Sequence, residues 1–483
     1  MGPDSFFMYN GYNEQYEGKE IMITVNFNED QHLYLQIVDE VIRQIAQGHL
    51  KSGDQLPSRR ALADHLKVSL NTVINAYDQL TDEGYIVSRE RSGYFVDLLA
   101  IDMLPSEEIE TKPQKHEHAK ISEASQYTYD FHFANRDMTT LKPKQLLQYA
   151  PDALAKSMVN CNLKEDLGAL PLRLAIANYL RKYRGVMTSA DNIIITGGHT
   201  ASLQTLFALL DDSIYALEDP GYYKNLDIFT NYQQKTIRIP IDKYGFSVKD
   251  LETTSANIVI TTPSHQFPTG IIMGMRRRQR LLKWAYQAEN RYIIENDYYN
   301  EFRLKGRPVP ALTSLDDQER VILLGAFRQS MGSIFKMSYL VLPDQLMKKF
   351  HQAHLKTSGI SSFEQYLMTD FLNSNHFPKY INSLRTNYRR KEKAVLAALH
   401  QSQLPLTIKE AGAGLFFIIN IEGEIPPADV IQARLAENKI RLQPVNHYAK
   451  LNNQFDQSYI LGYAGLALDE IDQAIQALVT IFK

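Results

Sequence analysis

Residues 321–343 read VILLGAFRQSMGSIFKMSYLVLP, two apolar runs on either side of a short polar segment that begins and ends with glycine. Short, continuous apolar runs are typical of strands that are buried on both faces of a sheet. Helical patterns separate further runs of the same kind, which are NIIIT (192–196), SIYAL (213–217), NIVIT (257–261) and RYIIE (291–295). This alternation predicts an α/β domain with a mostly parallel sheet covered by helices.

The composition is that of a water-soluble globular protein. Hydrophobic residues make up 44% and charged residues 22%, and no run of about 18 apolar residues is long enough to cross a membrane. The formal net charge is -3, so any nucleic-acid binding must depend on locally placed basic residues. Cys161 is the single cysteine, which excludes disulfides within the chain and zinc sites built from thiolates, and we expect no metal site. No cleavable leader is recognisable, and we expect a cytoplasmic protein.

At 483 residues the chain is long enough for two or three domains. Residues 1–27 are polar and rich in tyrosine and glycine, which is typical of a disordered tail. Residues 28–97 are predicted to form a compact module of three helices and a hairpin, and residues 98–127 a solvated linker. The α/β domain is expected to occupy residues 128–483, with a smaller C-terminal α+β lobe from about residue 344.

The segment LPSRRALADHLKVSLNTVINAYDQLTDEGY, residues 56–85, has the spacing of a helix-turn-helix. Ser58 and Ser69 are predicted to cap its two helices, the first of which is expected to bury Leu62, His65 and Leu66. The apolar stripe of the second helix leaves polar residues near its amino end for a DNA major groove, namely Asn71, Thr72 and Asn75. The hairpin that follows carries residues suited to phosphate or minor-groove contact, namely Arg89, Arg91 and Gly93.

Residues 56–96 resemble the winged helix-turn-helix of the GntR regulators. The resemblance implies that a dimer binds operator DNA, with Arg60 in the family's LPSxRxLA stretch and Gly93 as the wing glycine. It places Ser69, Asn71 and Thr72 at the start of the recognition helix. Leu70 departs from the family, which usually has arginine there. The basic residues on or near the expected DNA face are Arg59, Arg60, Lys67, Arg89 and Arg91.

Residues 128–483 resemble the fold type I aminotransferase domain that is fused to this module in the MocR/GabR-type regulators. The resemblance implies a homodimer and a pocket for pyridoxal phosphate (PLP). The motifs that carry it occur in the family's order: GALPLRLAIANYLRKYRGV (168–186), NIIITGGHTASLQTL (192–206), LEDPGYY (217–223), VITTPSHQFPTG (259–270), YIIENDYYNEFR (292–303), the 321–343 segment and ILGYAGL (460–466).

Several residues suit such a pocket. The turn Gly198, His199 and Thr200 precedes a predicted helix, whose first N–H groups would point at a phosphate. Tyr222 is expected to stack on the pyridine ring. Tyr298 belongs to the same pocket by resemblance.

Two groups that PLP chemistry requires are missing at their aligned positions. Gln329 stands at the Schiff-base lysine, and Asn296 at the aspartate that faces the ring nitrogen. Lys336 replaces the arginine that binds the phosphate, which keeps the charge but loses the bidentate fork. The arginine with which aminotransferases usually bind the carboxylate of their substrate is also missing, since Ile460 stands at its aligned position.

These observations predict a DNA-binding transcriptional regulator whose aminotransferase-like domain has no catalytic residue. The domain would serve dimerisation and non-covalent sensing of an effector, such as an amino acid, an amine or a B6 vitamer. One alternative is a PLP-dependent aminotransferase, or a regulator that binds PLP, through a displaced lysine, Lys336 or Lys224. PLP is implied by the family resemblance alone. Covalent PLP is not expected, and a regulator that binds PLP non-covalently is a second alternative.

Overall fold

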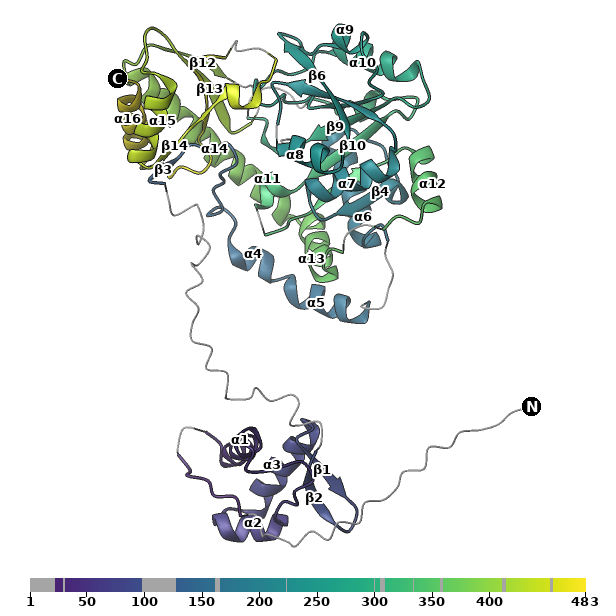
Figure 1. Ribbon diagram of the computed structural model, residues 1–483, viewed down its shortest axis with the longest axis vertical. Coiled ribbons are helices and arrows are strands. Elements are labelled where there is room, and N and C mark those ends of the chain that lie inside the picture. Colours follow the sequence, from purple (N-terminus) through teal and green to yellow (C-terminus); the bar gives the residue numbers. More distant parts are fainter. Residues whose placement is uncertain are drawn as a thin grey trace, which may run out of the picture. The chain divides into compact units, whose positions relative to one another are not determined.

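The structure is a computed structural model in which contacts divide the chain into two compact units, Met1–Ile121 and Ser122–Lys483 (Figure 1). It describes residues 22–28, 31–97, 127–160, 166–222, 224–298, 300–304, 309–332, 334–356, 359–410, 414–451 and 455–483. Residues 1–21 of the predicted tail and residues 98–126 of the predicted linker therefore lie outside the described residues. The predicted domain boundaries remain predictions at those points.

The first unit contains the three helices and the hairpin that the sequence predicts. Ser58 accepts a hydrogen bond from the Ala61 N–H at 3.2 Å, and Ser69 accepts one from the Thr72 N–H at 3.1 Å, so both serines cap helices as expected. The elements are α1 (Leu33–Ala46), α2 (Arg59–Leu66), α3 (Leu70–Asp82), β1 (Ile86–Arg89) and β2 (Gly93–Val96), with β1 and β2 antiparallel.

The core of this unit differs from the prediction at two places. His65 is exposed, whereas Leu62 and Ala63 are buried, because a polar ring gains more from water than from the apolar interior. Ile23 is completely buried in the same core, so the ordered unit begins before the predicted boundary at residue 28.

Tyr77 connects two segments of this unit. Its ring is buried, and its hydroxyl donates a hydrogen bond to the Pro57 carbonyl at 2.9 Å, which ties α3 to the segment before α2.

The second unit is built on a sheet of eight strands in the described part of the chain, in the order β4-β11-β10-β9-β8-β5-β6-β7. The strands from β10 to β6 are parallel. β11 and β7 run in the opposite direction, and the edge strand β4, which pairs antiparallel with β11, runs in the direction of the parallel strands, so the sheet is mostly parallel as predicted. The bounds are β4 (Ile193–Thr196), β5 (Ile214–Asp219), β6 (Lys235–Asp242), β7 (Gly245–Phe246), β8 (Ile258–Thr261), β9 (Tyr292–Asp297), β10 (Val321–Ala326) and β11 (Ser338–Val341).

Helices cover both faces of this sheet. Ile294 of β9 packs in a core with α7, α8 and α12, whereas its neighbour Ile293 packs on the other face with α9 and α10. This arrangement follows from the alternation of side chains along a strand. The helices of this layer are α4 (Pro143–Leu147), α5 (Ala150–Val159), α6 (Leu170–Arg184), α7 (His199–Leu209), α8 (Lys224–Asn231), α9 (Val248–Leu251), α10 (Met275–Tyr286), α11 (Arg328–Met331), α12 (Asp344–Gln352) and α13 (Ser362–Asn373).

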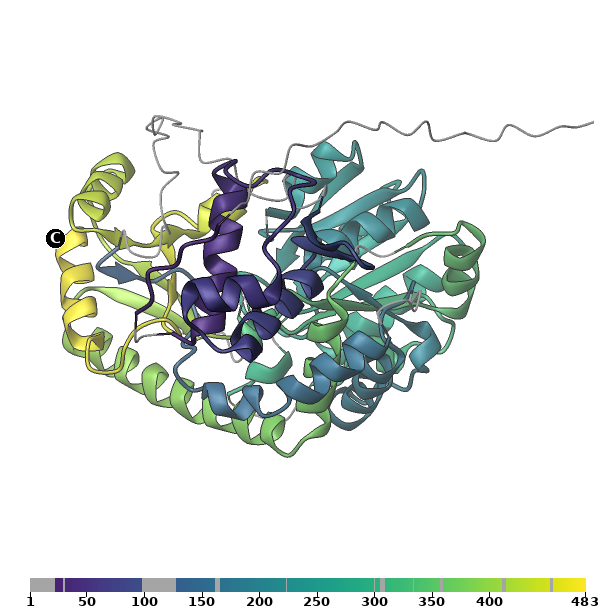
Figure 2. The ribbon, with the colours of Figure 1, turned by 90° about the horizontal axis from the view of Figure 1, so that it is seen from below.

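A smaller sheet in the order β12-β13-β16-β15 forms the second lobe of this unit. The 26-residue helix α14 (His376–Gln401) packs against α13 at one end and against α16 at the other, so it links the two lobes (Figure 2). None of the helices within the described ranges is long and apolar enough to cross a membrane. The remaining elements are β3 (Tyr129–Asp130), β12 (Leu406–Glu410), β13 (Phe416–Ile421), α15 (Ala428–Glu437), β14 (Ile440–Arg441), β15 (Gln443–Pro444), β16 (Ser458–Gly462) and α16 (Ile471–Phe482).

The segment GAFRQSMG, residues 325–332, begins with a glycine for a steric reason. Gly325 lies opposite Tyr339 in the antiparallel register of β10 and β11. A Cβ added to Gly325 would lie 2.1 Å from the Cζ of the buried Tyr339 ring. Only glycine allows this ring to pass over the strand at the point where β10 leads into α11.

We expect Gly325→Ala to lower the free energy of unfolding by about 1 to 3 kcal/mol, because the tyrosine ring must leave its packed position. The single tryptophan, Trp284, is buried in α10, so its fluorescence in a urea titration reports on this unit alone. Gly359→Ala is the matched control, because nothing lies within 4 Å of a Cβ at Gly359. Equal urea midpoints for the two variants would contradict the steric explanation.

Candidate functional site

A cavity of about 200 Å³ contains most of the predicted coenzyme-pocket residues. It is lined by residues that follow the carboxyl ends of the parallel strands, the usual place for ligands in such sheets. The predicted residues that line it are His199, Tyr222, Asn296, Tyr298 and Gln329. Gly198, Thr200 and Lys336 are not among its lining residues.

Gly198 and Lys336 nevertheless lie together beside this cavity. Gly198 has φ +96°, a conformation that favours glycine, and it precedes the first residue of α7, His199. A Cβ at Gly198 would lie 3.6 Å from Cγ of Lys336, so the lysine side chain runs along the turn. The first turn of α7 has N–H groups without acceptors inside the helix, and the adjacent ammonium group adds positive charge. This corner suits an anion.

Gln329 lies in the second position of α11, at the wall of the cavity. Its Oε1 atom is buried and has no hydrogen-bond partner among the described residues. A buried amide oxygen without a partner costs free energy unless a ligand or water donates to it. The side chain can accept a hydrogen bond there, but it has no amine that can form a covalent bond to an aldehyde.

Asn296 faces the cavity because of the side-chain alternation in β9. Its neighbours, Glu295 and Asp297, point away from it and are engaged elsewhere. Glu295 accepts hydrogen bonds from the Leu312 N–H at 2.7 Å and the Thr313 N–H at 2.9 Å. Neither carboxylate therefore lines the first cavity beside Asn296.

The cavity also contains charged and aromatic residues that the sequence analysis missed. Arg136, Arg238 and Arg328 supply positive charge, and Phe133 and Phe267 form an aromatic wall with Tyr222. Arg328 was detectable, because it precedes Gln329 in the polar segment of the 321–343 stretch. Arg238 lies in β6 and approaches the carboxylate of Asp219 at 3.7 Å, and this pairing across strands has no signal in the local sequence.

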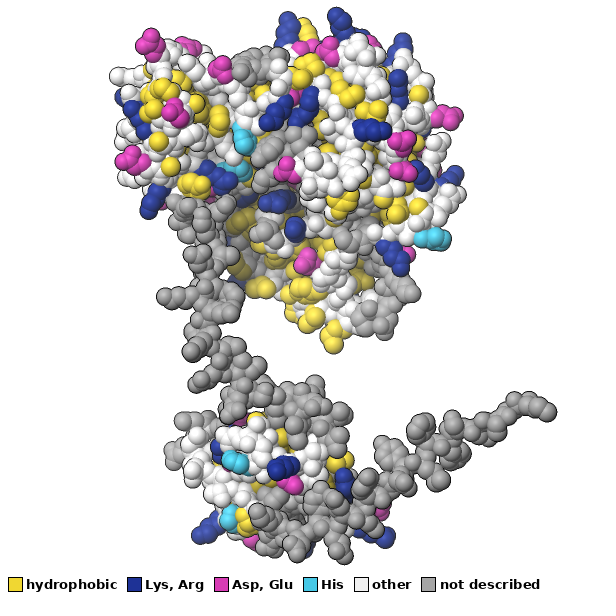
Figure 3. Space-filling view, viewed as in Figure 1, with side chains coloured by type: hydrophobic (Ala, Val, Ile, Leu, Met, Phe, Trp, Pro, Cys, Tyr) yellow, Lys and Arg dark blue, Asp and Glu magenta, His cyan; other side chains and the backbone are white. Residues whose placement is uncertain are grey.

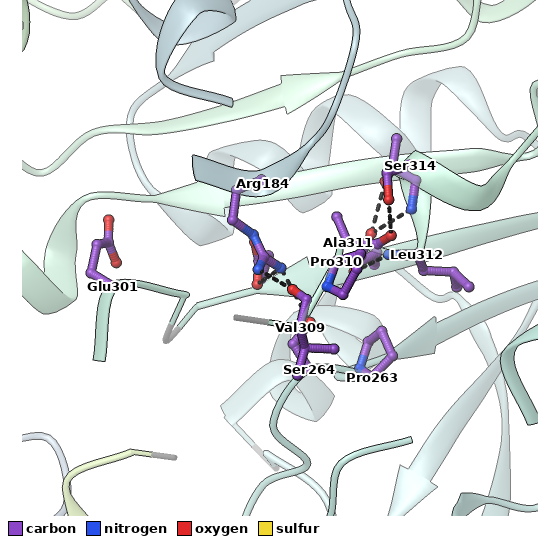
Figure 4. Close-up of polar contacts among 12 residues, drawn as sticks. Arg184, Pro263, Ser264, Glu301, Val309, Pro310, Ala311, Leu312 and Ser314 are labelled. Carbon is purple, nitrogen blue, oxygen red and sulfur yellow. Dashed lines mark hydrogen bonds and ion pairs between the residues drawn. The ribbon is translucent and has the colours of Figure 1, made fainter. Parts of the chain in front are cut away.

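An ion pair between Arg184 and Asp297 lies next to the cavity (Figure 4). The guanidinium group donates from Nε at 2.7 Å and from a terminal nitrogen at 2.9 Å, and the two side chains are 5% and 2% exposed. The same guanidinium group also donates to the Val309 carbonyl at 2.7 Å and to the Ser264 hydroxyl at 3.1 Å. Figure 4 draws Glu301 to one side of this network. Burial raises the pKa of Glu301 to about 7, although a hydrogen bond from the Tyr179 hydroxyl opposes the shift.

The predicted DNA contacts lie on the first unit. Thr72 is half-buried, and its hydroxyl lies 2.8 Å from that of Ser69. Two arginines rest on aromatic rings of the wing, since Arg59 lies 5.6 Å from the Tyr94 ring centre and Arg89 lies 4.5 Å from that of Phe95. The exposed members of the predicted set are Arg59, Arg60, Ser69, Asn71, Asn75, Arg89, Arg91 and Gly93.

Comparison with known proteins identifies both units. Residues 33–96 match the family described as bacterial regulatory proteins, gntR family, and residues 131–478 match aminotransferase class I and II. The chain is 34% identical over 470 residues to the uncharacterized HTH-type transcriptional regulator YdeL of Bacillus subtilis. The matched region covers 93% of this chain and 97% of the relative. It is 29% identical to the probable rhizopine catabolism regulatory protein MocR of Rhizobium meliloti, over 95% and 96% of the two chains.

The chain belongs to the MocR-type regulators of the GntR family. An archaeal alanine:glyoxylate aminotransferase has the same fold as the larger unit of this MocR-type regulator, with a TM-score of 0.65 and 23% identity over 73% of this chain and 90% of that one. The predicted fold class, a winged helix-turn-helix joined to a fold type I aminotransferase-like domain, is thereby confirmed.

The aminotransferase class I and II fold is associated with PLP, so the residues of the MocR-type regulator can be tested against that coenzyme. The corner of Gly198 and Lys336 suits a phosphate, and Tyr222 and Tyr298 border the cavity. The groups for covalent attachment do not fit, because no lysine is among the described side chains that line the cavity, and Asn296 supplies no charge for the ring nitrogen.

The pKa of Glu301 predicts a pH dependence of stability. The unfolded glutamate releases its proton near its ordinary pKa of 4.5, whereas the folded one releases it near 7. Between these pH values the folded state binds more protons, so the free energy of unfolding falls as the pH rises. Glu301→Gln does not titrate, and we expect the variant to gain about 3 kcal/mol relative to the natural chain between pH 4.5 and pH 8.

Trp284 fluorescence in urea, measured across this pH range, checks the expectation for Glu301. Glu437→Gln removes an exposed carboxylate from the same unit and is the control, which should keep the pH profile of the natural chain. If the free energy of unfolding changed with pH in the same way for the Glu301→Gln variant and the natural chain, the pKa of Glu301 would not be raised by folding.

Proposed function

We propose that this chain is an operator-binding transcription regulator whose aminotransferase-like domain senses a small molecule without catalysing transamination. The observation that carries the proposal is the position of Gln329 in the cavity, with its Oε1 atom buried and unpaired among the described residues. The cavity is retained, but its nucleophile is replaced by an amide. A retained pocket without its reactive amine is suited to reversible binding.

The first unit supplies the proposed DNA contact. Asn71 and Asn75 are exposed one turn apart near the amino end of α3, where recognition helices present side chains to base edges. Arg60 and Arg91 are exposed basic residues for phosphate contact. Family membership supports this assignment, because the GntR match covers residues 33–96.

We also propose that the regulator is a homodimer formed through its second unit. The helix α5 buries Ala153 against the domain but exposes apolar side chains on its other side, including Met158 at 68% and Val159 at 83% exposure. Hydrophobic side chains gather along this edge of the unit (Figure 3). Leu147, Leu154, Leu170 and Leu174 are exposed as well. An apolar surface of this kind is typical of a protein interface, and a second copy would cover it symmetrically.

Substitutions in the first unit test the DNA contact. We expect Asn75→Ala to weaken operator binding at least about tenfold by removing a base contact, and Arg60→Gln to reduce the slope of log affinity against log salt by about one. Fluorescence anisotropy with the DNA upstream of the protein's own gene measures both. Arg43→Ala removes an exposed arginine of α1 outside the predicted contacts and should bind as the natural chain does. If that DNA fails to bind the natural chain specifically, the regulator assignment is wrong.

Reduction with borohydride in the presence of PLP tests the sensing domain. Because borohydride also fixes PLP on exposed lysines, the linked positions are identified by peptide mass mapping. We expect no coenzyme at the cavity of the natural chain, and a small fraction at position 329 of the Gln329→Lys variant, because Asn296 and Lys336 still differ from the enzyme pattern. Gln329→Met removes the amide without adding an amine and is the control. Coenzyme fixed to Lys336 or Lys224 of the natural chain would instead establish the displaced-lysine alternative.

A further inference from the structure

A second cavity, of about 370 Å³, adjoins the first, because Asn296 and Tyr298 line both. Its other walls come from α6, from the segments that follow β8 and β9, and from α14 between Phe377 and Arg389. The volume lies in the range of small-molecule pockets. None of its lining residues was singled out for a ligand by the sequence apart from the two that it shares with the first cavity.

The charge of this second cavity is unbalanced. Arg184 is neutralised by Asp297, but Arg385 and Arg389 of α14 form no ion pair with any carboxylate among the described residues. Each donates a hydrogen bond from its Nε atom to the segment after β9. Arg385 donates to the Glu301 carbonyl at 2.6 Å, and Arg389 donates to the Leu304 carbonyl at 3.1 Å. These bonds fix the two guanidinium groups at the wall of the cavity, a geometry that suits carboxylate or phosphate oxygens.

Glu301 provides a further polar group in the same cavity. Its side chain is 4% exposed, and Oε1 accepts a hydrogen bond from Tyr179, whereas Oε2 has no partner among the described residues. A buried carboxyl oxygen without a partner is costly in the absence of a ligand, and in its protonated form it is a donor. Phe377 and Ile381 are buried and give the cavity an apolar wall. Arg303 also lines the cavity. Besides the Arg184–Asp297 pair, the lining therefore combines three arginines, the buried carboxyl group of Glu301 and an apolar surface for carbon atoms.

We infer that this second cavity binds a small organic dianion, a dicarboxylate or a phosphorylated compound, between the guanidinium groups of Arg385 and Arg389. The carbon part of the ligand lies on Phe377 and Ile381, and the carboxyl group of Glu301 donates to one of its oxygens. Only the role of this ligand as an effector depends on the proposed regulatory function. Binding itself is independent of whether the chain recognises DNA.

Isothermal titration of the full chain with succinate, and separately with inorganic phosphate, tests the site. We expect at least one of the two to bind with a dissociation constant below about 1 mM, and Arg389→Gln to weaken that binding at least about tenfold by removing a charged donor. Asn382→Asp is a second variant, because Asn382 lines the cavity on an exposed turn of α14 and accepts from Arg385 at 3.4 Å. The new carboxylate neutralises Arg385 and should weaken binding with little risk to folding.

The control is Arg390→Gln, which removes an exposed arginine of α14 that does not line the cavity and should leave binding unchanged. Binding of succinate alone identifies the carboxylate class, and binding of phosphate alone the phosphate class. Lack of binding by both probes at 10 mM, or about equal loss in the Arg390→Gln and Arg389→Gln variants, would overturn the inference. So would binding that Arg328→Gln abolishes and Arg389→Gln preserves, because the anion would then lie in the first cavity. Operator affinity without ligand, measured on the same variants, separates failure of this site from failure of the DNA-binding proposal.

Discussion

The ion pair between Arg184 and Asp297 holds together elements around the larger cavity, including β9, whose Asn296 lines both cavities. The arginine comes from the last residue of α6 and the aspartate from the last residue of β9, and both are almost completely buried. Removal of both ions from water costs several kcal/mol, which their contact offsets only with good geometry and additional hydrogen bonds. Arg184 makes those bonds to Ser264 and Val309, so one side chain connects four separate segments. The loss of either partner would leave an uncompensated charge, at a cost of about 3 to 5 kcal/mol.

The same ion pair keeps the acidic side chain next to Asn296 out of the first cavity. Asp297 is only one position from Asn296, but a strand presents adjacent side chains to opposite faces. Glu295, on the other side, is held by backbone N–H groups. The strand therefore offers one position to the cavity, and that position holds an amide. Gln329 on α11 presents a second amide to the same space. The two side chains present neutral hydrogen-bonding groups to the cavity, which suits recognition of a ligand.

Local sequence patterns were sufficient for much of this structure. Apolar runs located β4, β5, β8, β9, β10 and β11, serine caps located α2 and α3, and the order of motifs located Gln329 and Asn296. The pattern failed where distant segments meet. Ile23 looks like part of a polar tail until the core of the first unit encloses it. Arg385 and Arg389 look like the solvated face of a long helix, because the carbonyl groups that they hold lie more than 80 residues away. The acidity of Glu301 depends on burial, which no local pattern encodes.

The contacts of Arg385 and Arg389 lie on a single long helix, α14. Its 26 residues form one unbroken rod, about 39 Å long at 1.5 Å per residue. Arg385 and Arg389 lie near the middle of this rod, and α16 packs against it farther toward the small sheet. Because an unbroken helix resists bending, a small tilt imposed at the arginines becomes a larger displacement at its far end. The arginines of the cavity and the contact with α16 are thus parts of one rigid element.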